Sequence, residues 1–308
     1  MRLKTISLVT VTAAFAMSLG IDWADAQGRA PRQHTIIQSE GLPPLSPAVN
    51  QPPGQNEVSI TIEGDERVIR ANGIPATLVG SFPNEGNPNA IAVQPNEYRM
   101  PANPALTDRR TSLGLGEFGV AVDGIPFEPG AAEWYVGDPE AGWRYEALSG
   151  AIALGLDENF AHVQRTGKYH YHGLPMSLLA ALGTSDTAHS PLVGWAGDGF
   201  PIYAVFGYVE PDNPSAGIKT LKSSYQLKTN GRPEGGEDPG GIYDGTFIAD
   251  YEYVADAGDL DACNGRVTVT PEFPDGTYAY FLTAEWPVIP RCFRGTPGDA
   301  FLRPRFQD

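Results

Sequence analysis

Glycine and proline interrupt this chain so often that long helices cannot form most of it. The sequence has 36 glycines and 28 prolines among 308 residues, well above the average usage of about 7% and 5%. Between these breaks lie short runs in which apolar and polar residues alternate, as at 58–62 and 277–283. Such runs are typical of strands with one buried face. We therefore predict a mainly β fold: a single sandwich-like or distorted barrel domain with one or two short helices.

A few elements can be predicted individually. We expect a hairpin from 58–62 and 67–70, with the turn residues of 63–66 between them. The segment 175–183 has a proline at its start and a glycine at its end, which predicts a helix. Residues 145–148 are expected to open a second, shorter helix.

The N-terminus has the three parts of a secretory signal peptide, which we assign to residues 1–26. A basic start precedes a mostly apolar stretch and an A-x-A cleavage site that ends at Ala26. The apolar stretch is short for a spanning helix and no second one follows, so we expect no membrane span after cleavage. Residues 27–55 are predicted to be a proline-rich disordered arm, and 56–308 the β domain. The expected location is periplasmic or secreted.

Charge and cysteine content narrow the class of protein further. The formal net charge is −16, which argues against nucleic acid and anionic lipid as partners. The only cysteines are Cys263 and Cys292. In an exported chain an even cysteine count predicts a disulfide between them, with thiolate metal ligands as the weaker alternative.

Four of the five histidines lie within residues 162–189. His170 and His172 belong to a Tyr-His-Tyr-His string that is typical of a β-strand. Because side chains alternate along a strand, both imidazoles would share one face and the two tyrosines the other. Two imidazoles on one face can hold a single cation, so the string predicts a metal site.

The remaining histidines of the group complete this hypothesis. A turn at 165–167 allows His162 to fold back as a third ligand, and His189 is a fourth ligand or a group that orients one. Three neutral imidazoles suit copper or zinc, and such sites often keep one position open. The alternative is a polar cluster that connects loops by hydrogen bonds and holds no metal.

Three further patterns suggest chemistry, each with a simpler structural explanation. Asp198 lies between two glycines and is a candidate catalytic base, an oxygen ligand or a turn residue. Asp259 and Asp261 suggest calcium, although an EF-hand is excluded because Thr270 stands where its glutamate is needed. The tryptophans suggest a small-molecule or glycan ligand, but aromatic residues of β proteins more often form the core.

One string of the sequence has a similar copy further along the chain. Residues 167–172 resemble residues 276–281, and both follow a turn. These strings are either equivalent strands of two half-sheets or two independent strands in which alternating tyrosines simply suit the β conformation.

The sequence resembles the YHYH family of exported proteins, named for the string at 169–172. The similarity covers most of residues 115–297, in the strings 121–127, 162–175, 194–203, 259–265 and 287–295. The resemblance implies export and no established reaction. Other members can carry a histidine where this chain has Ala279, so if that position is a ligand there, this chain lacks it or uses another group.

Together these observations predict an exported protein that binds copper or zinc through its histidine cluster. Two alternatives stay open. One is a metal-dependent extracytoplasmic enzyme, hydrolytic or redox, that uses an open coordination position. The other is a metal-free module that binds carbohydrate or protein. Whether the chain is an enzyme is not decided by its sequence.

Overall fold

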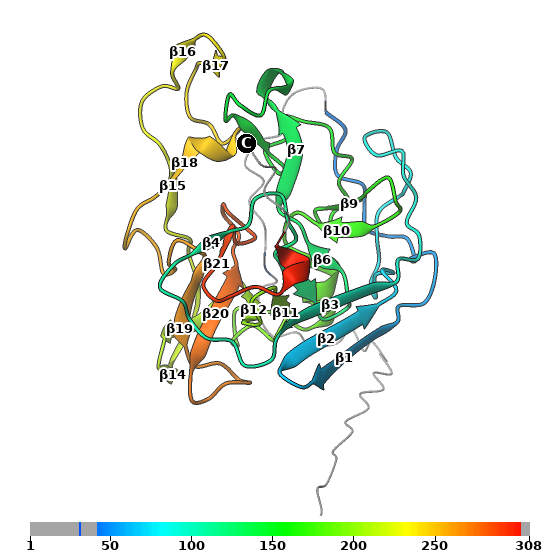
Figure 1. The fold of residues 1–308 in the computed structure, drawn as a ribbon, viewed down its shortest axis with the longest axis vertical. Coiled ribbons are helices and arrows are strands. Elements are labelled where there is room, and N and C mark those ends of the chain that lie inside the picture. Colours follow the sequence, from blue (N-terminus) through cyan, green and yellow to red (C-terminus); the bar gives the residue numbers. More distant parts are fainter. Residues whose placement is uncertain (1–30, 32–41, 303–308) are drawn as a thin grey trace, which may run out of the picture.

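The computed structural model describes residue 31 and residues 42–302 of the chain (Figure 1). The predicted signal peptide, residues 1–26, lies outside the described residues, as does most of the first half of the arm. The prediction of a mainly β fold is confirmed: the chain forms 21 strands and a single α-helix over the described residues.

An open eight-stranded sheet forms the centre of the molecule. Its two edges are different strands, so the sheet does not close into a barrel. In spatial order the strands are β19 (Gly265–Thr268), β20 (Thr277–Leu282), β12 (Pro201–Ala204), β11 (Gly194–Ala196), β5 (Gly119–Ala121), β6 (Pro126–Phe127), β10 (Tyr169–Tyr171) and β9 (Ala161–Val163).

This sheet consists of two halves with the same topology. In one half β5 and β6 are antiparallel, β10 is parallel to β6, and β9 is antiparallel to β10. In the other half β11, β12, β20 and β19 repeat the same relations. The halves meet where β5 pairs with β11 in antiparallel register. The strings at 167–172 and 276–281 are therefore equivalent strands of two half-sheets. This confirms the first of the two interpretations of their similarity.

Glycine is required where the two halves meet. A Cβ atom on Gly119 would lie 2.4 Å from the carbonyl oxygen of Trp195, and one on Gly194 equally close to that of Val120. Both distances are far below normal contact, so larger residues would force β5 and β11 apart.

The tyrosines of the two equivalent strands are anchored in the same way. On each strand both tyrosine hydroxyls donate a hydrogen bond to an aspartate carboxylate. The four bonds are Tyr169 to Asp157 (2.7 Å), Tyr171 to Asp123 (3.1 Å), Tyr278 to Asp261 (3.0 Å) and Tyr280 to Asp198 (2.6 Å). These bonds fix one face of β10 and of β20 to the interior.

A second, three-stranded sheet is formed by β1 (Val58–Glu63), β2 (Glu66–Ala71) and β3 (Asn96–Pro101). The predicted hairpin is confirmed, with β1 and β2 paired in antiparallel register. The expectation that its first strand is half-buried is wrong, because all six residues of β1 are exposed. β1 is an edge strand, and the buried residues of this hairpin come from β2, whose Val68 and Ile69 are fully buried.

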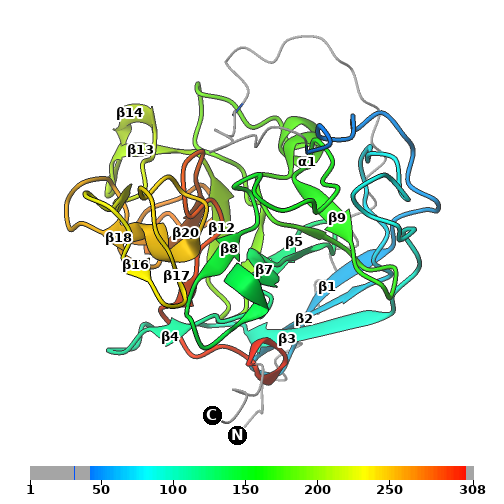
Figure 2. The same cartoon turned by 90° about the horizontal axis from the view of Figure 1, so that it is seen from above.

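The remaining elements are short. Antiparallel pairs are formed by β4 (Thr111–Ser112) with β21 (Cys292–Phe293), β7 (Gly130–Trp134) with β8 (Arg144–Glu146), β13 (Phe206–Glu210) with β14 (Asn213–Thr220), β15 (Tyr225–Leu227) with β18 (Tyr251–Tyr253), and β16 (Glu234–Gly235) with β17 (Asp238–Pro239). Three 3-10 turns lie at Tyr135–Gly137, Ile248–Asp250 and Asp299–Phe301. Figure 2 shows the β13–β14 hairpin and the β1–β3 sheet at opposite ends of the molecule.

The helix predicted at 175–183 is confirmed as α1 (Met176–Ala181), and Gly183 follows it with a positive φ of 74°. The helix predicted at 145–148 is wrong, because β8 occupies its start. There Tyr145 packs against Phe247, with ring centroids 4.8 Å apart, so a tertiary contact overrides the local preference. Within the described part of the chain, no helix has the length and apolar character that a membrane span requires.

The described part of the predicted disordered arm, residues 42–55, differs from the expectation. The Ser46 amide donates to the Leu156 carbonyl at 3.0 Å, and Leu45 packs against the core. Backbone hydrogen bonds to the domain thus order a segment whose composition offers few apolar side chains.

The cysteine prediction is confirmed. Cys263 and Cys292 form a disulfide across 29 residues of sequence. It connects β21 to the turn before β19, at the edge of the sheet that lies far from β9 in strand order.

Candidate metal centre

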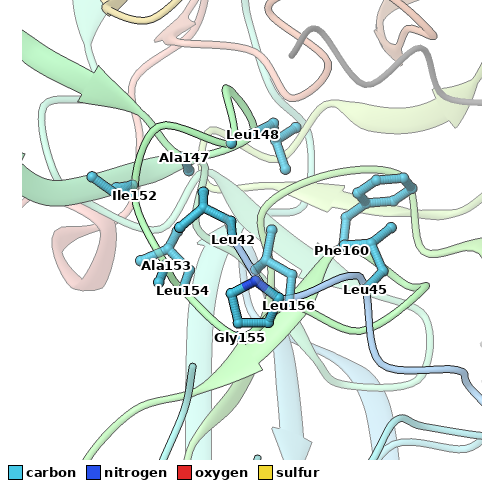
Figure 3. A pocket seen from close by; sticks show the side chains of 12 residues that line it. Leu42, Leu45, Ala147, Leu148, Ile152, Ala153, Leu154, Gly155, Leu156 and Phe160 are labelled. Atoms are coloured by element: carbon cyan, nitrogen blue, oxygen red, sulfur yellow. The ribbon is translucent and has the colours of Figure 1, made fainter. Parts of the chain in front are cut away.

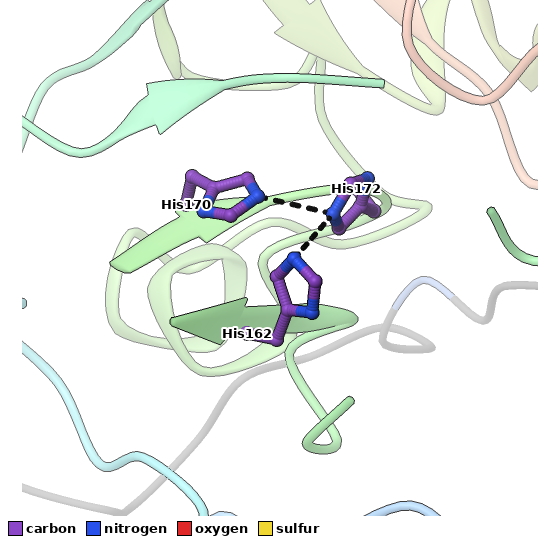
Figure 4. A group of neighbouring side chains, drawn as sticks. All are labelled: His162, His170 and His172. Carbon is purple, nitrogen blue, oxygen red and sulfur yellow. Dashed lines mark hydrogen bonds between the residues drawn. The ribbon is translucent and has the colours of Figure 1, made fainter. Parts of the chain in front are cut away.

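Three imidazoles converge on the face of β9 and β10 that is opposite to the anchored tyrosines (Figure 4). His170 lies directly across from His162 in the antiparallel pair, and His172 follows two residues later on the same face. The tyrosine–aspartate bonds hold the other face of β10, so strand alternation aims both of its histidines at one point. The sequence prediction for these three residues matches their placement.

The Nε2 atoms of the three rings are the ones that meet. Nε2 of His172 lies 3.1 Å from Nε2 of His170 and 3.1 Å from Nε2 of His162. His170 and His172 are 1% and 2% exposed, whereas His162 is half-buried. The site therefore lies inside the protein, and His162 is its most exposed member.

The other ring nitrogens face backbone carbonyls. Nδ1 of His162 donates to the Leu154 carbonyl at 2.8 Å, and Nδ1 of His170 donates to the Lys168 carbonyl at 3.3 Å. A carbonyl can only accept, so in the neutral rings the proton resides on Nδ1 and the lone pair on Nε2. Nδ1 of His172 is buried beside the Pro129 carbonyl without a well-formed hydrogen bond.

Burial favours the neutral form of His162 and His172. It lowers the pKa of His172 well below its usual value, and the charges of His162, His170 and Arg291 lower it further. Burial also lowers the pKa of His162, although the hydrogen bond to Leu154 opposes this effect. Neutral imidazole is the form that binds a metal ion.

Comparison with known proteins identifies the family of this chain. The model of a protein family described as YHYH protein matches residues 97–295, about two thirds of the chain. This chain belongs to the YHYH family. The matched region contains both halves of the large sheet and all three converging histidines. No curated protein and no solved structure gives a significant match.

His189 of this YHYH protein does not join the other histidines. Its Nδ1 donates to the Ser190 carbonyl at 2.8 Å, and its ring packs against Tyr203 and Tyr208, with centroids 4.9 and 4.8 Å apart. The structure thus brings together three of the four predicted ligands. His189 lies in the segment before β11 and packs beside Phe281 of β20, in the second half of the sheet.

Asp198 also lies in the second half and is fully buried. Its Oδ2 accepts hydrogen bonds from the Tyr280 hydroxyl and from the Gly295 amide at 2.6 and 2.8 Å. Burial raises the pKa of this carboxyl, and these hydrogen bonds lower it. Asp198 occupies the position that Asp123 has in the first half, where it likewise anchors a tyrosine.

The two acidic residues suggested for calcium are each paired with a basic side chain. Asp259 accepts from Lys219 and from the Lys222 amide, and Asp261 lies 3.3 Å from Nε of Arg294. Asp261 also accepts from the Tyr278 hydroxyl. Calcium at these residues remains a prediction that rests on their spacing alone.

Two of the tryptophans in the described part of the chain are buried. Trp286 is 6% exposed, stacks on Tyr251 at 4.2 Å and donates to Glu146, while Trp143 is 8% exposed and donates to Asp238. Both side chains are therefore part of the interior.

Sequence reasoning missed two charged groups on the segments that flank the histidine strands. Glu128, directly after β6, is 8% exposed and accepts from Nε2 of Gln164 at 2.8 Å. Arg291 donates to the Pro129 carbonyl at 3.0 Å and forms a buried ion pair with Glu146 at 2.8 Å. No motif marks either residue, because both reach the site only through the pairing of distant strands.

An apolar pocket of about 70 Å³ lies next to the centre (Figure 3). Leu154 and Phe160 line it, and their carbonyls accept hydrogen bonds from His162 and from the His172 amide. Among the described residues, those that line this pocket carry no charge. Its lining is Leu42, Pro43, Leu45, Ala147, Leu148, Gly150, Ile152, Ala153, Leu154, Gly155, Leu156 and Phe160.

Proposed function

We propose that this protein binds one transition-metal ion, copper or zinc, through Nε2 of His162, His170 and His172. The observation that carries the proposal is the approach of Nε2 of His172 to the Nε2 atoms of His162 and His170, whose rings have their protons on Nδ1. If His172 carries its proton on Nε2, it can donate to only one of these two neighbours at a time. If it carries its proton on Nδ1, three lone pairs face one another inside the protein, which is unfavourable unless a cation lies between them.

The distances support a metal ion in this position. Bonds of 2.0–2.1 Å from a tetrahedral zinc ion to two imidazole nitrogens place those nitrogens about 3.3 Å apart. Two of the separations are 3.1 Å, and the three nitrogens lie within 4.8 Å of one another. Small side-chain rotations would therefore complete the site.

The surroundings favour a protein that holds a metal over one that converts a substrate. Two of the three imidazoles are almost fully buried, and Asp198, the candidate base, is engaged in anchoring Tyr280. The disulfide supports a periplasmic or secreted location, because disulfides persist in oxidising compartments. A metal-dependent enzyme stays the second candidate, and the half-buried His162 is the edge from which a substrate would approach.

Removing two ligands tests the proposal. We expect His170→Ala/His172→Ala to lose stoichiometric metal, because a single imidazole binds copper or zinc weakly. The mature protein is purified without an affinity tag and its metal content is measured by elemental analysis; its intact mass shows whether the chain begins at Gln27.

The matched control is His189→Ala, which removes a buried imidazole outside the centre. It should retain the metal content of the unchanged protein. Equal metal content in the double variant and the unchanged protein would refute the proposed function.

A further inference from the structure

We infer that Glu128 is the anionic member of this centre and that its carboxylate shifts the preference of the site toward a divalent ion. The inference rests on the proposed metal site and names the charge class of the ion.

The pairing register of β6 and β10 places the Glu128 side chain on the face of the sheet that carries His170 and His172. Phe127 pairs with Tyr171 in parallel β6 and β10, and their rings lie 5.7 Å apart on the tyrosine face. The Glu128 amide then donates to the Tyr171 carbonyl at 2.9 Å. Because side chains alternate, the residue after Phe127 points to the opposite face, which carries His170 and His172.

The hydrogen bond to Gln164 confirms this direction. Gln164 follows His162 by two residues and so shares its face, and its Nε2 donates to Glu128 Oε2 at 2.8 Å. In the sheet β10 lies between β6 and β9. The backbones of β6 and β9 are therefore about 10 Å apart, with β10 between them. The side chains of Glu128 and Gln164 meet above β10, on the face from which His170 projects.

The second half of the sheet shows that the scaffold does not need this carboxylate. There Arg266, Ala279 and Phe281 occupy the positions of the three histidines, as the pairing of β19 with β20 shows. Tyr203 occupies the position of Glu128, since Ile202 pairs with Tyr280 as Phe127 pairs with Tyr171. The imidazoles and the carboxylate are absent together, so Glu128 belongs with the histidines and not with the strand geometry.

Charge explains what the carboxylate does. The three imidazoles are neutral ligands, and the nearby Arg291 is already paired with Glu146. The attraction between a carboxylate and an ion at a given distance is proportional to the charge of the ion. Glu128 consequently stabilises zinc(II) by about twice the free energy that it contributes to copper(I).

The test compares the two ions in one variant. Glu128→Gln removes the charge and keeps an oxygen that can accept from Gln164. We expect zinc(II) affinity to fall about 10–100-fold, as for other groups next to metal ligands, and copper(I) affinity only about 3–10-fold. Competition with chromophoric chelators, without oxygen for copper(I), measures both affinities in the full mature protein.

Two further variants make the result decisive. Glu133→Gln removes an exposed carboxylate whose charge acts on His162, and both affinities should stay within about twofold because water screens it. Glu128→Asp keeps the charge and should retain the preference even where Glu128→Gln lowers the thermal unfolding midpoint. Equal losses for both ions, or none, in Glu128→Gln would overturn the inference and leave the metal site intact. An unchanged protein that binds neither ion would refute the proposed function itself.

Discussion

At the scale of single residues, the buried carboxyl of Asp123 should make stability depend on pH. Burial raises its pKa from 3.8 to about 6, although hydrogen bonds from Ile125 and Tyr171 oppose the shift. The folded protein then binds this proton more tightly than the unfolded chain does. Its contribution to the free energy of unfolding is complete below about pH 4 and is lost as the pH rises to about 6.

Asp123→Asn removes this titration. Between pH 4 and pH 6 the free energy of unfolding of the unchanged protein should fall relative to the variant, by up to about 3 kcal/mol. Urea denaturation at a series of pH values measures the difference. Asp212→Asn, at an exposed turn, should show a constant difference, and a constant difference for Asp123→Asn would contradict the prediction.

At the scale of elements, the two equivalent strands β10 and β20 should differ in how much they depend on their tyrosine anchors. Tyr169 donates to Asp157, which is fully buried, whereas Tyr278 donates to Asp261, whose side chain is 34% exposed. Tyr169→Phe should lower the free energy of unfolding by about 1–3 kcal/mol, because a buried acceptor loses a partner. Tyr278→Phe should cost less than about 1 kcal/mol, because water replaces the hydroxyl. Denaturant unfolding of both variants at neutral pH measures the contrast, and equal costs would argue against it.

At the scale of the whole molecule, the disulfide and the metal centre lie in different halves of the large sheet. Cys263 precedes β19, and the histidines lie on β9 and β10 at the other edge. Cys263→Ser/Cys292→Ser should lower the free energy of unfolding by about 3 kcal/mol through the freed loop of the unfolded chain. Its metal content at 20 °C should be unchanged. Denaturant unfolding and elemental analysis check both expectations; loss of metal from a folded variant would show that the halves are coupled.

The sequence by itself determined the β class, the helix at 175–183, the disulfide and the shared face of His170 and His172. Each of these depends on local rules: glycine and proline as breaks, alternation along a strand, and an even cysteine count. The similarity between residues 167–172 and 276–281 also indicated that the sheet has two related halves, although it left open whether the two strings were equivalent strands.

Only the tertiary structure decided which distant residues accompany the histidines. Strand pairing brings His162 opposite His170. His189 and Asp198 lie with the second half of the large sheet instead. Glu128 contacts Gln164 above β10. Pairing partners are chosen by the packing of whole faces, and no local pattern in the sequence encodes them. For the same reason the exposure of β1 and the strand at Tyr145 differed from the local expectation.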